Sequence, residues 1–308
     1  MSKTSELNAQ FQSLLKSHKS ILFYVEIGDF WKDQDFQFET TLRLLPFQQQ
    51  TKIISKKFNK DAQTALANQL LQRFVCCLFK KSTDINSVEF GFNSFGKPYL
   101  LDTNHDHSSS SSSSSSSNNK LSFSMSNQQG FTSMIINTSN REVGIDLASI
   151  SDCDKFGPLD QLISNFKDIF HEDEFEILNQ IEKDHKLKVL FTEYWALKES
   201  YAKKIGIGLN ANIETFNFKF VGSVEYLQPK ERENPSIDQL KLLQNQQVQW
   251  MDSTKLYIYD NLEKNLDIFL TQLTKDIVVS VVGDSLENAP LVVKVPLDTI
   301  VGYFQTKN

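Results

Sequence analysis

Residues 191–204, FTEYWALKESYAKK, constrain the fold more than any other part of this sequence. The apolar positions in and just before this stretch recur at intervals of four and three, the period of an α-helix: Leu190, Tyr194, Leu197 and Tyr201. Gly206 and Gly208 follow directly and favour a left-handed helix stop. The sequence therefore predicts a long helix over residues 186–205 with one buried face.

Three other side chains of this helix, Trp195, Glu199 and Lys203, stand four residues apart and line up on one side. One interpretation is a solvated ion pair beside a packed tryptophan, because most exposed pairs of this kind contribute little. The alternative is a functional group of charges. The helix alone leaves both open.

The bulk composition predicts a folded protein with room for two domains. The chain has 308 residues, 40% of them hydrophobic, including 24 Phe. The net charge of −6 disfavours a general nucleic-acid binder, because no broad basic face neutralises phosphates.

The cysteines and the apolar segments favour a reduced, cytoplasmic protein. Cys76, Cys77 and Cys153 form neither a C-x-x-C motif nor an even set, which disfavours disulfides and a zinc site. The apolar run at residues 21–27 contains Glu26, which is typical of a strand and not of a signal peptide. No apolar stretch is long enough to span a membrane.

Short strands and longer helices are predicted in both parts of the chain, which indicates an α+β fold. We divide it into residues 1–140 and 141–308. Strands are expected at 21–27, 88–92, 99–101, 121–125, 131–136, 143–147, 216–220, 256–259, 266–269, 277–282 and 291–295. Further helices are expected from Asp61, as N-cap, and at 159–170 and 173–181, and residues 228–249 are expected to be a surface loop.

A flexible insertion is predicted at residues 104–120, where His105 and His107 precede ten consecutive serines at 108–117. Alternating segments on its C-terminal side predict a hairpin, so the insertion interrupts a loop within one domain. A metal site at the two histidines is disfavoured.

Gly91-Phe-Asn-Ser-Phe-Gly96-Lys97-Pro98 resembles a phosphate-binding loop up to its last position. Pro98 stands where a magnesium-binding hydroxyl is required, and it also lacks a backbone N–H. We therefore exclude a nucleoside triphosphatase and predict a tight turn that presents Lys97. The pair Gly206 and Gly208 follows a helix and not a strand, so it is no dinucleotide fingerprint.

Three acidic positions come from separate elements: Asp146 at a predicted strand end, Glu174 at a helix start, and Glu199 one turn before Lys203. Alone, Asp146 could be a turn residue and Glu174 a first-turn acid. Together they offer the oxygen ligands that Mg²⁺ takes when substrate phosphates complete its shell. A lysine nearby would stabilise a leaving phosphate. The combination favours metal-assisted phosphoryl or phosphodiester transfer.

These residues, in this order, resemble the Sfp-type 4′-phosphopantetheinyl transferases, and within them the eukaryotic branch that also serves aminoadipate-semialdehyde dehydrogenase. The resemblance covers about residues 20–220. The matching segments are Lys60-Asp-Ala, Phe95-Gly-Lys-Pro-Tyr99, Phe123-Ser-Met-Ser126, Val143-Gly-Ile-Asp146, Phe170-x-x-x-Glu174-Phe175 and Trp195-Ala-Leu-Lys-Glu-Ser200 with Lys203.

The resemblance implies a pseudo-dimer of two similar halves, each a small, mainly antiparallel sheet packed with a long helix, with coenzyme A between them. A serine of an apo carrier protein attacks the pantetheine-side phosphorus, and 3′,5′-ADP leaves. Asp146 and Glu199 match magnesium ligands, and Glu174 matches a further ligand or base. Glu199 is also a candidate base, and Lys203 matches the lysine at the departing phosphate.

Residues that match coenzyme A contacts are Lys60, Lys97, Ser126, Asn127, Lys198 and Lys203. The implied partners are coenzyme A and carrier domains of fatty-acid, polyketide or lysine biosynthesis, and the implied state is a monomer in the cytoplasm, with neither nucleic acid nor membrane as partner.

Two positions depart from the family pattern. Asn127 stands where a histidine normally contacts the pyrophosphate, and it cannot carry a charge. Ala148 stands where bacterial members have a second acid. The eukaryotic branch also often lacks that acid, so Asn127 alone suggests one alternative, a coenzyme A- or carrier-binding homologue with weak turnover. A second alternative is an unrelated magnesium phosphotransferase.

Deleting residues 108–117 is expected to leave the transfer activity nearly unchanged, because lengthening a flexible loop adds little to the free energy of closing it. Initial rates of carrier loading by the full and the shortened chain test this. A large loss of activity would indicate that the serine tract contacts the carrier.

Overall fold

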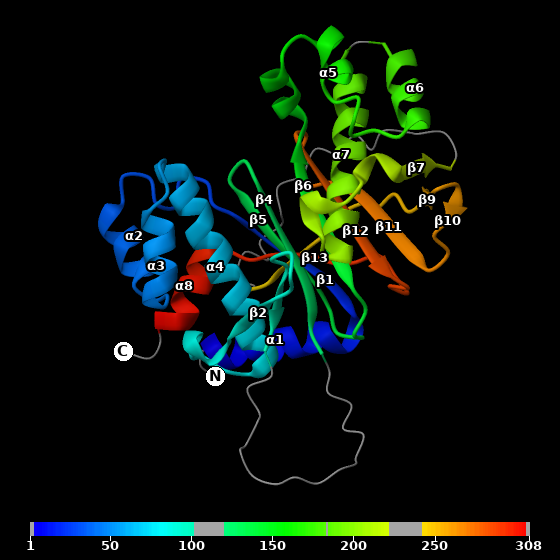
Figure 1. The fold of residues 1–308 in the computed structure, drawn as a ribbon. Helices are drawn as coiled ribbons and strands as arrows, with labels where there is room; N and C mark the ends of the chain where they lie inside the picture. The colour runs from blue at the N-terminus through cyan, green and yellow to red at the C-terminus, as the bar shows by residue number, and fades with distance from the viewer. Residues whose placement is uncertain (1–2, 102–119, 183, 222–241, 306–308) are drawn as a thin grey trace.

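The computed structural model describes residues 3–101, 120–182, 184–221 and 242–305. These residues form two halves that meet near the centre of Figure 1, with helices packed on mainly antiparallel sheets. The predicted α+β class is confirmed. The predicted serine insertion lies almost wholly outside the described residues.

The N-terminal half is built on a five-stranded sheet. In spatial order its strands are β4 (Ser122–Gln128), β5 (Phe131–Asn137), β1 (Ser20–Glu26), β13 (Leu291–Lys294) and β8 (Gln244–Gln246). Its helices are α1 (Lys3–Ser17), α2 (Asp35–Leu42), α3 (Phe47–Ile54), α4 (Asn59–Lys80) and α8 (Leu297–Gln305). A short hairpin of β2 (Phe90–Phe92) and β3 (Pro98–Leu100) completes this half.

The C-terminal half has two three-stranded sheets. One contains β11 (Leu266–Gln272), β12 (Ile277–Asp284) and β6 (Val143–Ser149), and the other β10 (Asn261–Leu262), β9 (Thr254–Ile258) and β7 (Phe216–Phe220). Its helices are α5 (Leu159–Asn165), α6 (Glu172–Gln180) and α7 (His185–Ile205). Helix α7 packs on β6 and β12 and ends at Gly206 in the left-handed conformation, which confirms the predicted long helix.

The chain returns to the N-terminal half at its C-terminal end. Strand β13 pairs in parallel with β1, and Val293 and Ile300 lie in the same apolar core as Phe23 and Phe74. A division of the sequence at residue 141 therefore leaves out the return of β13 to this sheet. The sequence pattern carries no signal for a parallel pairing across some 270 residues.

Several local predictions were wrong. Helix α4 begins after Phe58, so Asp61 lies in its first turn and is not its N-cap. Asp146 lies in the middle of β6 and not at a strand end. Part of the predicted loop at 228–249 is strand β8, and residues 228–241 lie outside the described residues. Helices α1, α2, α3 and α8 were not predicted.

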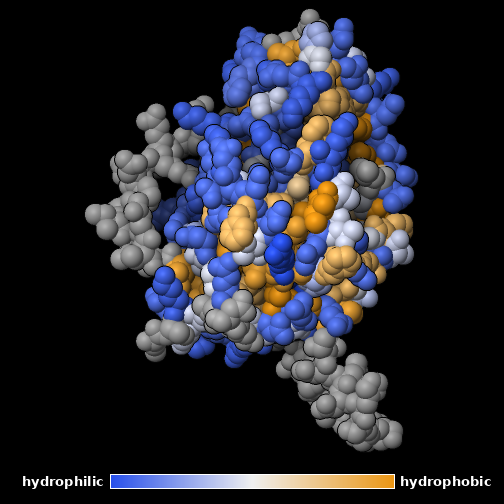
Figure 2. Space-filling model, turned by 90° about the vertical axis from the view of Figure 1, so that its left-hand side faces the viewer, coloured by the Kyte–Doolittle hydropathy of each residue, from blue (hydrophilic) through white to orange (hydrophobic). Residues whose placement is uncertain are grey.

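The face that carries α2 and α3 is mainly hydrophilic, with apolar side chains gathered near its middle (Figure 2). Exposed apolar residues of this region are Phe36, Phe47, Ile54 and Phe58. Among the residues that the structure describes, no helix combines the length and the apolar character needed to cross a membrane.

The two halves meet where β4 and β6 lie side by side, and serine side chains make the connection. Ser124 Oγ accepts a hydrogen bond from the backbone N–H of Ile145 (3.3 Å), and Ser126 Oγ accepts one from Leu147 (3.1 Å). Alternate residues of a strand face the same side, so serines two apart can satisfy alternate N–H groups of β6. This seam places Ser126 next to Asp146.

Gly144→Ala is expected to destabilise the protein by about 3 kcal/mol or more, because β6 approaches α7 too closely for a side chain. A Cβ at Gly144 would lie 2.0 Å from the Ser200 carbonyl oxygen and 2.5 Å from the Lys204 backbone nitrogen. Urea unfolding measures the loss. The control is Gly302→Ala in α8, where a Cβ would meet no atom of the described residues within 4 Å, so the substitution should stabilise the helix. Equal stability of both variants would contradict the close packing.

Candidate active site

Asp146, Ser126 and Lys203 form one hydrogen-bonded group at the seam between the halves. Asp146 is buried on β6, and its Oδ1 accepts from Lys203 Nζ (2.6 Å) and from Ser126 Oγ (3.0 Å). Lys203 Nζ also donates to Ser126 Oγ (3.0 Å).

Glu199, one turn before Lys203 on α7, is half-buried and adds a second carboxylate. Burial raises the pKa of Asp146, although Lys203 and Ser126 act against it. Burial also raises the pKa of Glu199, and the nearby Asp146 raises it further. The two carboxylates therefore lie close enough to repel each other, with Lys203 as the cation beside them.

The neighbours of Glu199 in the sequence attach α7 to the rest of the C-terminal half. Ser200 Oγ shares a hydrogen bond with Ser280 Oγ of β12 (2.7 Å), and Ser280 is the cross-strand partner of Asp146. Lys198 Nζ donates to the carbonyl oxygens of Ile213 (3.0 Å) and Phe216 (2.5 Å). These anchors fix the rotation of α7 and so leave Glu199 and Lys203 on the side of Asp146.

The structure does not bring Glu174 into this group. Glu174 is fully buried in α6, and its Oε2 lies 2.7 Å from Lys198 Nζ. Its Oε1 accepts from the Phe218 backbone N–H (2.8 Å), and Oε2 also accepts from that of His171 (3.0 Å). Contrary to the expectation from the sequence, Glu174 and Lys198 contact each other and backbone groups, so neither enters the function proposed below.

Lys97 also lies elsewhere than the resemblance implied. Its Nζ donates to Glu142 Oε2 (3.0 Å) and to the carbonyl oxygens of Val143 (3.3 Å) and Lys204 (2.9 Å). The side chain is only 17% exposed. Lys97 thus bonds to the ends of β6 and α7.

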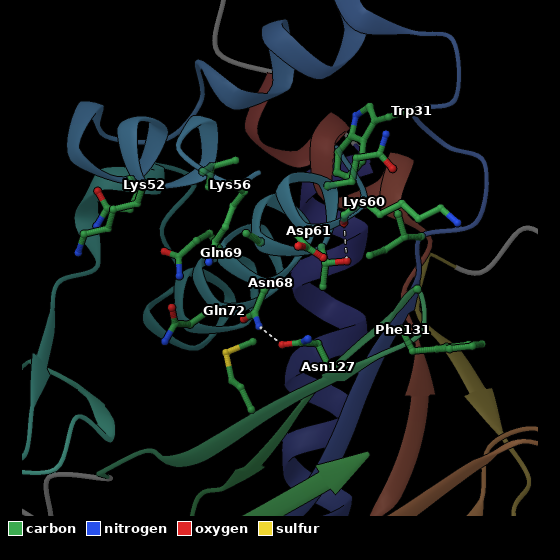
Figure 3. A pocket seen from close by; sticks show the side chains of 18 of the residues that line it. Trp31, Lys52, Lys56, Lys60, Asp61, Asn68, Gln69, Gln72, Asn127 and Phe131 are labelled. Carbon is green, nitrogen blue, oxygen red and sulfur yellow. Dashed lines mark hydrogen bonds between the residues drawn. The ribbon is translucent and has the colours of Figure 1, made fainter. Parts of the chain in front are cut away.

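A cleft of about 2270 Å³ lies beside this group. Helices α3 and α4 and the β4–β5 hairpin line most of it, and Asp152 and Lys155 of the C-terminal half complete the lining. Lys60 and Asn127 line it, and Asn68 Nδ2 donates to Asn127 Oδ1 (3.3 Å; Figure 3). The acidic group is not part of the lining, but Asn127 follows Ser126 directly on β4. The cleft and the acidic group are therefore neighbours.

Sequence reasoning missed two further lysines of the cleft, Lys52 and Lys56. With Lys60 they recur every four residues across the α3–α4 junction. That recurrence was the available signal, but only the fold shows that all three lysines line the same cleft.

Two family models match consecutive parts of the chain. The model of the N-terminal part of 4′-phosphopantetheinyl transferases matches residues 29–139, and that of the 4′-phosphopantetheinyl transferase superfamily matches residues 142–253. The chain belongs to this superfamily. The first match covers most of the residues that line the cleft, and the second covers Asp146, Glu199 and Lys203.

Curated relatives of this phosphopantetheinyl transferase homologue include two yeast proteins, each called L-aminoadipate-semialdehyde dehydrogenase-phosphopantetheinyl transferase. The protein of Candida glabrata is 35% identical over 59% of this chain and 63% of its own length. The protein of Saccharomyces cerevisiae is 34% identical over 64% of this chain and 66% of its own length. The 4′-phosphopantetheinyl transferase HetI of Nostoc is 30% identical over 40% of this chain and 43% of its own length. The matches thus span less than two thirds of these relatives.

Glu193→Gln is expected to stabilise the protein at neutral pH. Glu193 is a buried residue of α7 whose Oε2 has no hydrogen-bond partner in the described chain, and burial raises its pKa from 4.5 to about 8. Between these values the folded state keeps a proton that the unfolded chain has lost, so stability falls as the pH rises through this window. At pH 7.5 the variant should gain about 2–4 kcal/mol, since each pH unit contributes about 1.4 kcal/mol.

Urea unfolding of both proteins at pH 5 and pH 7.5 tests the Glu193 prediction. The difference between variant and wild type should be small at pH 5 and large at pH 7.5. A difference that does not depend on pH would contradict a proton held by Glu193.

Proposed function

We propose that this protein transfers the 4′-phosphopantetheine group of coenzyme A to a serine of an apo carrier protein. The main support for this proposal is the pair of carboxylates, Asp146 and Glu199, beside Lys203 at the seam between the halves. In the reaction the serine Oγ forms a bond to the pantetheine-side phosphorus, the pyrophosphate P–O bond breaks, and 3′,5′-ADP leaves.

Asp146 and Glu199 are the residues that would hold Mg²⁺. Among the described residues no three His, Cys, Asp or Glu side chains lie together, so two carboxylates are what the chain offers. This set fits Mg²⁺, which takes one or two protein carboxylates and completes its shell with substrate phosphates and water. It also fits because the two acids repel each other and gain from a cation between them. When bound, the ion would neutralise charge on the pyrophosphate.

The remaining roles follow from the contacts of each side chain. Ser126 donates to Asp146 Oδ1 and so helps to hold that carboxylate in one orientation. Lys203 supplies a positive charge for the departing phosphate. Glu199 accepts the proton of the attacking serine, since Glu174 is engaged with Lys198 and with backbone N–H groups.

Coenzyme A would bind along the cleft, with its phosphates near Lys60, Asn127 and the lysines at 52 and 56. The carrier domain of an aminoadipate-semialdehyde dehydrogenase is the first candidate partner, because the yeast relatives are named for it. Carriers of fatty-acid and polyketide synthesis are further candidates. We also propose a monomer that acts in the cytoplasm.

Loading of purified apo carrier domains with coenzyme A and Mg²⁺, followed by mass spectrometry of the carrier, tests the proposal. The expected result is a mass gain of one phosphopantetheine group that chelation of Mg²⁺ abolishes. Binding of coenzyme A without a mass gain on any carrier would favour the weakly active binding homologue suggested by Asn127.

A further inference from the structure

A tight turn of the N-terminal half holds the C-terminal end of α7. The turn connects β2 to β3 and is organised by Asn93, whose Oδ1 accepts from the backbone N–H groups of Phe95 (2.9 Å) and Lys97 (2.8 Å). The Asn93 Nδ2 donates to the carbonyl oxygen of Gly206 (2.8 Å), the residue that ends the helix. This bond satisfies a carbonyl that the helix itself leaves free.

Lys97, at the end of the same turn, connects the two elements that carry the acidic group. Its bond to the Lys204 carbonyl reaches the last turn of α7, directly after Lys203. Its bond to the Val143 carbonyl reaches the start of β6, three residues before Asp146. One ammonium group thus fixes the end of the helix relative to the strand.

The contacts leave Lys97 little capacity to bind a phosphate. A protonated lysine has three N–H donors, and the three protein acceptors at Nζ account for all of them. Lys97 is also absent from the cleft lining, although its neighbour Pro98 belongs to it. The packing is tight as well, because a Cβ at Gly206 would lie 2.8 Å from Asn93 Nδ2 and 3.1 Å from Lys97 Cδ.

We propose that Asn93 and Lys97 are positioning residues that hold the end of α7 and thereby set Lys203 and Glu199 against Asp146. The proposal rests on the proposed transfer function and replaces the role of Lys97 as a coenzyme A contact. The physical reason is that reacting groups must be held to within a fraction of an ångström, and an error of about 1 Å can lower a rate about 100-fold.

Lys97→Met tests the proposal, since it keeps the aliphatic stem and removes the donors. The kcat of carrier loading should fall about 10- to 100-fold. The KM for coenzyme A and the Kd for 3′,5′-ADP, measured by calorimetry, should change less than about threefold, because the variant removes no contact with the bound ligand. A rise of tenfold or more in both constants with an unchanged kcat would show that Lys97 binds phosphate, and would overturn the proposal.

Asn93→Ala provides an independent variant, because Asn93 carries no charge that a phosphate could use. It should lower kcat in the same direction, and the double variant with Lys97→Met should lose less than the product of the two effects. The matched control is Lys188→Met at the other end of α7, where the lysine pairs with Asp154 (2.5 Å). That variant should keep the wild-type kcat.

Hydrogen exchange of the full chain separates this proposal from the proposed function and remains informative if a variant is unstable. The amides of the last turn of α7 should exchange faster in both variants, whereas those of the first turn should not. Unchanged exchange would overturn the positioning role even where kcat falls. If the wild-type chain loads no carrier, the proposed function fails, while exchange still decides whether this turn holds the helix.

Discussion

Glu199→Gln is expected to lower the rate of phosphopantetheine transfer at least about 100-fold without lowering the stability of the protein. The rate falls because the change removes both a proposed ligand of Mg²⁺ and the proposed proton acceptor, and loss of a general base alone typically lowers rates about 10²- to 10⁴-fold. Stability should not fall, because burial and the nearby Asp146 already disfavour the ionised form, as the raised pKa of Glu199 indicates.

Single-turnover loading of an apo carrier and urea unfolding of the same preparations measure both effects. Glu193→Gln is the matched control, since it makes the same substitution six residues earlier on α7, at a side chain outside the acidic group. It should gain stability and keep its transfer rate. If Glu199→Gln transferred at the wild-type rate, the assignment of the metal site and of the base would both be wrong.

Features that local sequence patterns determine were predicted well. Helix α7 was predicted to within one residue, because its apolar period and Gly206 are both local signals. The β4–β5 hairpin followed from the alternation of apolar residues. The functional role of Asp146, Glu199 and Lys203, which motif order suggested, stays a prediction. The same motif contains Lys198 and Ser200, and the sequence alone does not show that these two side chains are buried anchors whereas Glu199 belongs to the site.

Features that depend on contacts between distant segments were not predicted. The pairing of β13 with β1 joins the ends of the chain, and no local pattern specifies it. Lys97 matched a ligand position by sequence, yet it bonds to Val143 and Lys204, which lie 46 and 107 residues away. An acid or a lysine in a motif therefore indicates that charge is needed there, but only the fold shows which group it faces.

Glu174→Ala is expected to destabilise the protein by about 3–5 kcal/mol, the usual result of removing one partner of a buried ion pair. Lys198 would remain with its side chain only 2% exposed and without its ion-pair partner. The Phe218 backbone N–H would lose its acceptor, and α6 would lose the capping box that Glu174 forms with His171. Urea unfolding at neutral pH measures the loss.

Two further variants separate this structural role from a catalytic one. Glu174→Leu combined with Lys198→Met should recover much of the lost stability, because replacing both charges by apolar groups leaves no unpaired charge inside. Asp173→Ala, on the same helix as Glu174, breaks an exposed pair with Lys219 of β7 and one hydrogen bond from Asn217, and should cost clearly less stability than Glu174→Ala. If Glu174 were a ligand of Mg²⁺ or the base, Glu174→Ala would instead stay stable and lose transfer. Stability measured without metal or substrate therefore distinguishes the two roles.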